Sequence, residues 1–162
     1  MQSYHIHYST NPASIAAHQL QGFFVGWNRH PSAMTHKALL ESSDFAVMAI
    51  DRSTNRVVGF ITAITDGVLS ASIPFLEVLP EYQGRGIGSE LVRGMLRQLA
   101  HFYMVDLVCE ESLISFYSRF GFAPCRAMSL RRYDRVPGRE EVGHTGAAYP
   151  SESDSTGIAR AA

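Results

Sequence analysis

Residues 83–88, which read Gln-Gly-Arg-Gly-Ile-Gly, have the composition of a phosphate-binding turn. Glycines remove side chains from a turn, so successive backbone N–H groups can converge on an anion. An apolar-periodic helix is expected directly after this turn, and its N-terminus would add a partial positive charge. The sequence therefore predicts that the segment binds a phosphate or pyrophosphate group without needing much net positive charge.

Two other phosphate-binding turns do not fit these residues. The P-loop of nucleotide-hydrolysing proteins needs GxxxxGK followed by Ser or Thr, and no lysine stands near this turn. A dinucleotide-binding fingerprint counted from Gly84 meets Ser89 at its third glycine, and one counted from Gly86 meets Leu91. The turn also follows a predicted antiparallel meander. Neither a nucleotide hydrolase nor a dinucleotide-binding domain is therefore expected.

The composition limits the classes of partner. With 162 residues, 46% of them apolar and 18% charged, the chain suits one domain with a sizeable core. The formal net charge is −1 and there is no lysine-rich run, so no nucleic-acid partner is expected. No apolar stretch reaches the roughly 20 residues that a bilayer requires, and the first residues lack a signal-peptide pattern. We expect a cytoplasmic protein without membrane contact.

The residues that commonly bind metals are dispersed along the chain. The seven histidines form no HExxH pair, and the two cysteines, Cys109 and Cys125, lack CxxC spacing. No metal site is therefore expected, and both thiols are expected to be reduced and structural.

The elements that must position the turn follow from hydrophobic periodicity. Asp66-Gly67 is a tight-turn pair that should fold one strand back onto the next, so the first four strands form an antiparallel meander. We expect, in chain order, a strand at 4–8, helices at 12–27 and 35–42, strands at 45–50, 57–64 and 68–78, a helix at 88–102, a strand at 104–109, a helix at 112–120 and a strand at 127–133. From residue 134 the composition changes to Pro, Gly, Ser, Glu and Ala, which indicates a flexible tail at 134–162. This order predicts an α/β (α+β) fold with a mixed, mainly antiparallel sheet of about six to seven strands and helices on both faces.

Two motifs in this order resemble the GNAT superfamily of acyl-CoA-dependent N-acyltransferases. The first is Gln-x-x-Gly-x-Gly at 83–88, preceded by Val-x-Pro at 78–80, and the second is Phe-Tyr-x-x-x-Gly-Phe at 116–122. Together with the matching order of elements, the resemblance extends over roughly residues 4 to 133. It implies a GNAT acyltransferase domain at 1–133, a sheet whose fourth and fifth strands splay apart, and acetyl-CoA as cosubstrate.

The resemblance also implies where the cosubstrate would bind. Its pantetheine arm would pair with main-chain groups near Leu76 and Val78 in the gap between the splayed strands. The side chain of Arg85 would add a charge-assisted contact to the pyrophosphate. The backbone that would hold the pyrophosphate belongs to Gln83, Gly84, Arg85, Gly86, Ile87, Gly88 and Ser89.

Aminolysis of a thioester needs a neutral amine, stabilisation of the developing negative charge on oxygen, and a proton for the departing thiolate. The resemblance places Tyr117 near the sulfur as the acid and a backbone N–H near Val78 at the oxygen. The catalytic carboxylate of the family's histone-modifying branch falls on Ser72 in this chain. The base therefore stays open between Glu110, which we favour, Glu77, and ordered water.

Phe24 and Trp27 stand in the first predicted helix, which the resemblance places over the acceptor site. They would form an aromatic wall suited to an aromatic or apolar amine, or they belong to the core, which is the commoner role of such a stripe. The implied function is an N-acetyltransferase that moves an acetyl group from acetyl-CoA to a primary amine, of a small molecule or a peptide, by direct attack in a ternary complex. The alternative is a non-catalytic acyl-CoA-binding sensor or interaction module. A homodimer is compatible with the resemblance.

Overall fold

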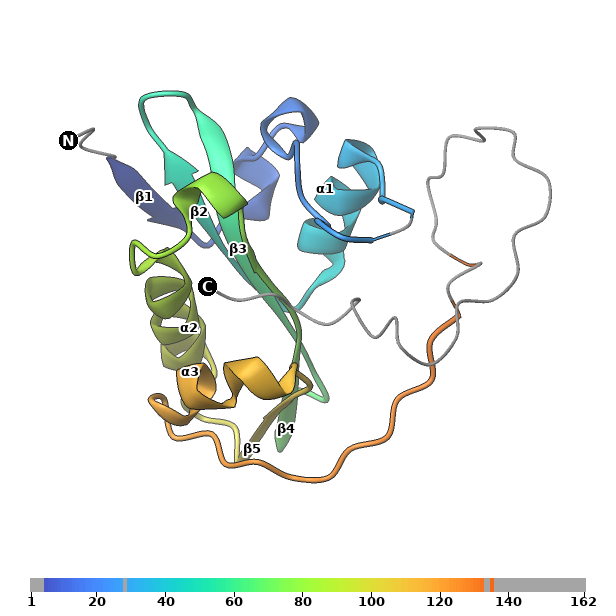
Figure 1. Cartoon of the computed structure of the whole chain (residues 1–162). Helices are drawn as coiled ribbons and strands as arrows, with labels where there is room; N and C mark the ends of the chain where they lie inside the picture. The colour runs from blue at the N-terminus through green and yellow to red at the C-terminus, as the bar shows by residue number, and fades with distance from the viewer. Residues whose placement is uncertain (1–4, 28, 133–134, 136–162) are drawn as a thin grey trace.

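The computed structural model, which describes residues 5–27, 29–132 and 135, is built around one sheet of five strands (Figure 1). The first four strands are antiparallel neighbours in chain order, and the fifth joins the fourth in parallel. The strands are β1 (Ile6–Ser9), β2 (Phe45–Asp51), β3 (Arg56–Thr65), β4 (Ser70–Val78) and β5 (Met104–Leu107). The predicted fold class and meander are confirmed, although the described residues form five strands where six to seven were expected.

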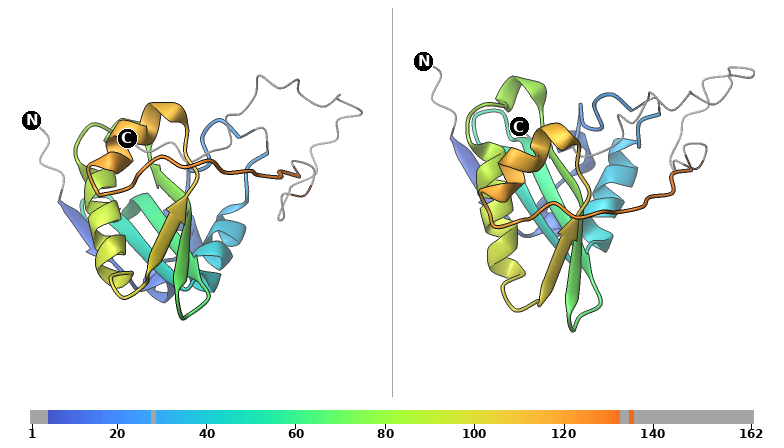
Figure 2. Two further views of the ribbon diagram at one scale, coloured as in Figure 1. Left: turned by 90° about the horizontal axis from the view of Figure 1, so that it is seen from below. Right: turned by 60° about the horizontal axis from the view of Figure 1, so that its bottom comes forward.

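Helices cover both faces of the sheet. Figures 1 and 2 show α2 on one face, with α3 near it, and α1 on the opposite face. The α-helices are α1 (Ala33–Ser42), α2 (Ile87–Gln98) and α3 (Ile114–Ser118), and the 3₁₀ turns are η1 (Pro12–Ser14), η2 (Ala17–Gln19), η3 (Pro80–Tyr82) and η4 (Glu111–Leu113). No described helix is both long and apolar enough to cross a bilayer.

The buried stripe of α2 explains how the helix is held against the sheet. Leu91, Val92 and Met95 are buried on the face that contacts β2 and β3, as the predicted amphipathic pattern requires. The helix ends at Gln98, before the predicted end at 102. This packing fixes the N-terminus of α2 at the end of β4.

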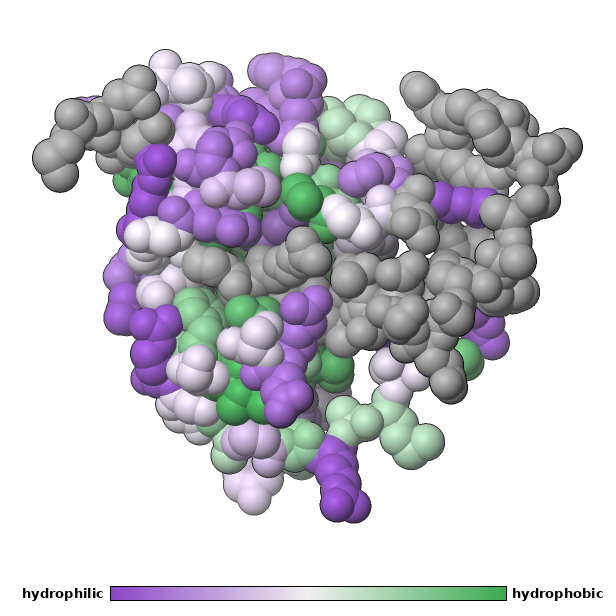
Figure 3. All heavy atoms as spheres, viewed as in Figure 1, coloured by the Kyte–Doolittle hydropathy of each residue, from purple (hydrophilic) through white to green (hydrophobic). Residues whose placement is uncertain are grey.

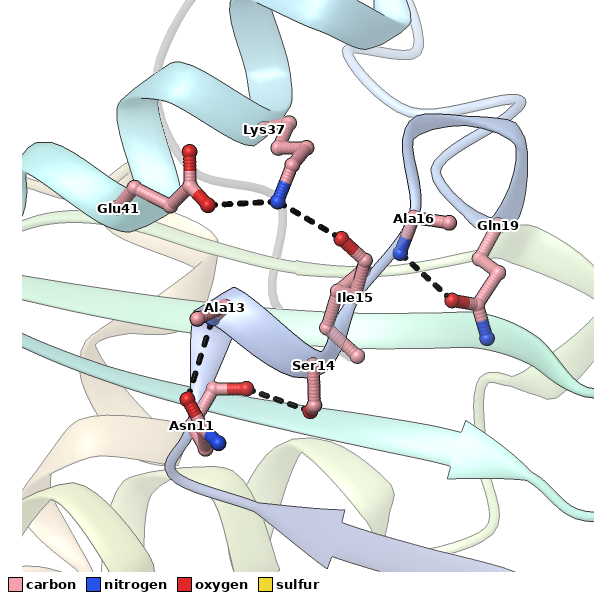
Figure 4. A network of polar contacts seen from close by, with 8 residues as sticks. All are labelled: Asn11, Ala13, Ser14, Ile15, Ala16, Gln19, Lys37 and Glu41. Atoms are coloured by element: carbon pink, nitrogen blue, oxygen red, sulfur yellow. Dashed lines mark hydrogen bonds and ion pairs between the residues drawn. The ribbon is translucent and has the colours of Figure 1, made fainter.

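The predicted helix at 12–27 is wrong. The chain forms η1, η2 and an irregular segment instead, because Gly22, Phe24 and Gly26 have φ angles of +87°, +62° and +84°, which no α-helix contains. Local hydrogen bonds from side chains and from the backbone hold η1 and η2, instead of the regular backbone hydrogen bonds of an α-helix. In Figure 4, Lys37 Nζ donates to the carbonyl of Ile15 at 2.9 Å and bonds Glu41, so α1 anchors this segment.

The predicted strand at 127–133 is also wrong over the described residues 127–132. These residues lie outside every helix and strand, and Met128 and Leu130 are exposed. On the face seen in Figure 3, apolar atoms gather in the lower part of the molecule, where α3 and the segment after it run. Alternating apolar residues do not make a strand without a hydrogen-bonded neighbour. The predicted tail at 134–162 lies outside the described residues except for Arg135.

Candidate functional site

A gap opens in the sheet between β4 and β5. The two strands pair only from Ser70↔Met104 to Ile73↔Leu107, whereas β4 continues beside β3 as far as Val78. One extra residue of β4 is inserted between the pairs Phe75↔Thr62 and Ser72↔Ile64, which makes a β-bulge that includes Pro74. A proline has no N–H to donate to a neighbouring strand. The predicted splay of the fourth and fifth strands is therefore confirmed.

Backbone polar groups of β4 face this gap. The N–H of Leu79 donates to the carbonyl of Val58 at 2.9 Å, toward β3. Along an antiparallel strand, the backbone N–H and carbonyl groups of successive residues point to alternate sides. Glu77, two residues before Leu79, therefore also bonds β3 through its backbone. The backbone groups of Leu76 and Val78 point to the other side, toward the gap. An extended ligand could pair with these groups as an added strand.

The turn after β4 forms an open cradle of backbone N–H groups. Gly84 and Gly86 have φ angles of +71° and +80°, and a Cβ at either position would meet no atom within 4 Å. The first bond of α2 runs from the N–H of Glu90 to the carbonyl of Gly86 at 3.1 Å, so the preceding amides are not used by the helix. The amides left for an anion at the helix start are those of Ile87, Gly88 and Ser89. This geometry fits a pyrophosphate group.

Side chains around the cradle fix its position. Gln83 Nε2 donates to the carbonyl of Val78 at 2.9 Å, which ties the first residue of the cradle to the last residue of β4. The Arg85 guanidinium lies over the Tyr82 ring, 5.7 Å from its centroid. The contact of Arg85 with a phosphate stays a prediction.

Sequence reasoning missed one buried carboxylate that supports the cradle. Asp51, at the end of β2, is fully buried and accepts hydrogen bonds from the Tyr82 hydroxyl at 2.9 Å and from Ser53 N and Oγ at 2.9 and 2.6 Å. Burial opposes its ionisation, but the hydrogen bonds from Ser53 and Tyr82 outweigh this, and its pKa is lowered. The sequence carries one signal for this residue. It is a carboxylate at the end of an apolar strand, where a buried carboxylate needs hydrogen-bond donors.

Tyr117 is buried next to the start of α2. Its ring packs edge-on against Phe116 and Phe122, with centroids 5.0 and 5.8 Å apart. The ring of Phe116 lies 3.6 Å from the point where a Cβ on Gly88 would stand, so α3 packs on the cradle end of α2. Burial, together with the neighbouring Cys109 thiol, raises the pKa of Tyr117. The phenol is therefore protonated at neutral pH.

The carboxylates proposed as base lie in different surroundings. Glu110 follows β5, is half-buried, and its carbonyl accepts from Leu113 N at 3.0 Å. Asp106 of β5, a further carboxylate in this part of the chain, is exposed and stands beside Ser72 in the parallel register. Within the described part of the chain, no three His, Cys, Asp or Glu side chains come together as a metal site.

The side chain of Glu77 is engaged by the loop that contains Phe24 and Val25. Its carboxylate accepts hydrogen bonds from the N–H of Phe24 at 2.8 Å and of Val25 at 3.0 Å, and burial raises its pKa. Phe24 is buried, and its ring packs edge-on against the rings of Trp27 and Phe75, with centroids 5.2 and 6.2 Å away. Trp27 and Phe75 are partly exposed. Phe24 is thus core, while Trp27 and Phe75 present an aromatic surface beside it.

Comparison with known proteins finds similar chains. The acetyltransferase (GNAT) family model matches residues 12–122. An uncharacterized N-acetyltransferase, ycf52, from Porphyra purpurea is 31% identical over 120 residues, which are 71% of this chain and 69% of that protein. A solved structure from Deinococcus radiodurans R1, assigned as an acetyltransferase, is 40% identical with a TM-score of 0.80 over 85% of this chain and 96% of that one.

An aminoglycoside N-acetyltransferase solved in complex with CoA shares the fold at 14% identity, with a TM-score of 0.59 over 81% of this chain and 96% of that one. The chain spans 58% and 56% of the length of two further curated relatives.

Proposed function

Because this chain belongs to the GNAT family of acetyltransferases, we propose that it is an N-acetyltransferase that moves an acetyl group from acetyl-CoA to a primary amine. The observation that carries the proposal is the cradle at 83–89 standing directly beside the gap between β4 and β5. The cradle suits a pyrophosphate, and the gap suits an extended pantetheine arm. Their adjacency matches a cosubstrate that has both parts.

The residues present fit acetyl-CoA. Gly84 and Gly86 leave open space where a side chain would otherwise stand, and the amides at the start of α2 would hold the pyrophosphate oxygens. The gap-facing groups of Leu76, and the second lone pair of the Val78 carbonyl that already accepts from Gln83, would hydrogen-bond the pantetheine arm. Arg85 would strengthen the phosphate contact if its side chain turns from Tyr82 toward the ligand.

Acetyl-CoA supplies an activated acyl group, and the residues of this chain manage the protons. The amine nitrogen forms the new C–N bond, the C–S bond breaks, and the nitrogen loses one proton while the sulfur gains one. The Val78 N–H would stabilise negative charge on the carbonyl oxygen, and Tyr117 would donate its proton to the sulfur. Glu110, directly or through water, would accept the proton from the amine.

The acceptor would be a primary amine of a small molecule or of a peptide, reacting directly in a ternary complex. The partly exposed rings of Trp27 and Phe75 favour an amine with an apolar or aromatic part. A cytoplasmic location and a homodimer stay predictions.

A panel of amines scored by thiol release from acetyl-CoA tests the proposal. The panel includes arylalkylamines, polyamines, and peptides with free N-termini or lysines, and mass spectrometry identifies the acetylated product. Amine-dependent thiol release with an acetylated product supports the transferase. Ser72, which stands where the family's histone-modifying branch has its catalytic carboxylate, leaves a second candidate, an acyl-CoA-binding module. Tight CoA binding with no release on any amine would favour that candidate, and competition among acetyl-, propionyl- and succinyl-CoA identifies the acyl group.

A further inference from the structure

The acceptor loop, residues 22–27, adopts an unusual backbone conformation. Gly22 and Gly26 have φ angles of +87° and +84°, and Phe24 between them has +62°. The left-handed region is accessible to glycine but costs a bulky residue of order 1 kcal/mol or more. The loop therefore needs an interaction that holds Phe24 in this conformation.

Glu77 supplies that interaction from β4. Its Oε2 accepts from the N–H of Phe24 at 2.8 Å, and its Oε1 accepts from the N–H of Val25 at 3.0 Å. Both oxygens of the carboxylate are thus engaged by consecutive amides of the loop. Hydrogen bonds to a charged acceptor are stronger than neutral ones, and the bond from Phe24 is partly buried.

We propose that Glu77 is a positioning residue that fixes the acceptor loop to β4 and so sets the affinity for the amine, and that it is not the base. The inference rests on the proposed function for the identity of the acceptor. A base must turn a lone pair toward the amine, whereas the two loop amides, one on each oxygen, hold the Glu77 carboxylate toward the loop. Its role is to hold the aromatic surface next to the thioester.

The contacts of the loop transmit this constraint to the aromatic surface. The Trp27 N–H donates to the carbonyl of Phe24 at 3.1 Å, and its ring packs against those of Phe24 and Phe75 at 5.2 and 6.4 Å. Glu77 stands in the strand between Leu76 and Val78, whose backbone groups face the gap. One rigid strand thereby positions both the cosubstrate and the acceptor surface.

The substitution Glu77→Gln tests the proposal. Glutamine has the same size but presents an NH₂ donor where an oxygen accepted a loop amide, so one hydrogen bond is lost. We expect the KM for the amine to rise about tenfold, kcat to stay within about threefold and the affinity for CoA to stay unchanged. Trp27 is the one tryptophan of the chain, so its fluorescence reports the loop. Its emission should move to longer wavelength, and acrylamide should quench it more.

Two further variants separate the contact between Glu77 and the loop from other effects. Glu90→Gln makes the same chemical change at an exposed carboxylate of α2, which pairs with Arg93 at 2.6 Å outside the loop, and should change neither KM for the amine nor fluorescence. Gly26→Ala strains the same loop without altering any carboxylate, because residue 26 has a φ of +84°. It should reproduce the rise in KM and the fluorescence change of Glu77→Gln.

Two results for Glu77→Gln would overturn the proposal. A fall in kcat of about a hundredfold or more in Glu77→Gln, with unchanged KM and fluorescence, would identify Glu77 as the base and overturn the proposal. Unchanged kinetics and fluorescence would overturn it as well. If the wild-type protein acetylates no amine, the proposed function fails, but the Trp27 emission and quenching of Glu77→Gln still decide whether the carboxylate holds the loop.

Discussion

The Tyr82 hydroxyl donates a 2.9 Å hydrogen bond to Oδ2 of Asp51, which joins the end of β2 to the turn that leads into the cradle. Asp51 is fully buried and takes its other hydrogen bonds from Ser53. This pair links the sheet to the phosphate-binding turn through a side-chain contact between residues 31 positions apart. The turn before the cradle is therefore held by a buried carboxylate that belongs to another strand.

Tyr82→Phe removes one donor from that buried carboxylate. We expect the free energy of unfolding to fall by about 1–3 kcal/mol and the affinity for CoA to fall severalfold, because the turn loses its anchor. Urea denaturation and calorimetric titration with CoA measure the two effects. Tyr103→Phe, at a side chain that is 84% exposed, is the matched control. Equal stability of the two variants would contradict the anchoring role.

Gly84→Ala and Gly86→Ala should separate backbone strain from ligand contact. Both positions have positive φ and open space around a Cβ, as does Gly67, which has a φ of +75° in the distant β3–β4 turn. Each alanine should cost about 1 kcal/mol of stability. Only the two cradle variants should lose CoA affinity, by about tenfold or more, because the added methyl stands where the pyrophosphate would bind. A comparable loss of affinity in Gly67→Ala would show that strain alone explains it.

Tyr117→Phe keeps the buried ring and removes the proton donor. If Tyr117 protonates the leaving thiolate, kcat should fall by about a hundredfold or more, while the dissociation constant for CoA changes by no more than about twofold. Steady-state kinetics with the best amine of the panel, together with calorimetry, measure these values. Turnover equal to that of the wild-type protein would remove the assigned role.

His36 should make stability depend on pH. It is buried among the rings of Phe23, Phe24 and Phe60, and neither ring nitrogen has a hydrogen-bond partner among the described residues. Burial lowers its pKa from 6.5 to about 4. Between these values the unfolded chain binds more protons than the folded one, so stability is lost as pH falls from about 6.5 to about 4, by about 3 kcal/mol in total.

Urea denaturation of the wild-type protein and His36→Leu, at several pH values between about 4 and 7, measures this contribution. The variant should lose that part of the pH dependence and remain folded at neutral pH, because the leucine leaves no unpaired nitrogen. His18→Leu, at an exposed histidine, is the control. Identical pH dependence in the wild-type protein and His36→Leu would contradict the prediction.

The parts of the site that the sequence predicted are those encoded by local spacing. The cradle needs only Gly84 and Gly86 in front of an amphipathic helix, and both motifs could be located from short stretches of chain. The predicted helix at 12–27 was wrong because buried apolar residues recur at similar intervals in an irregular segment packed on a sheet.

Long-range partners could not be predicted from spacing. Glu77 bonds Phe24 across 53 positions, and nothing near Glu77 in the chain indicates that its carboxylate is engaged. Its assignment as a candidate base followed from its place in β4 alone. The strand predicted at 127–133 likewise depended on a neighbour that a single stretch of sequence cannot provide.

The unpaired end of β4 also bears on how the ligand-free protein behaves in concentrated solution. An open stretch of strand is a template for pairing with another chain, and such edges promote aggregation. Pro74 partly protects the edge, since it offers no N–H to an incoming strand. A cosubstrate lying along the gap would act as a molecular cover, so purification with CoA present should keep the protein monodisperse at concentrations where the ligand-free form self-associates.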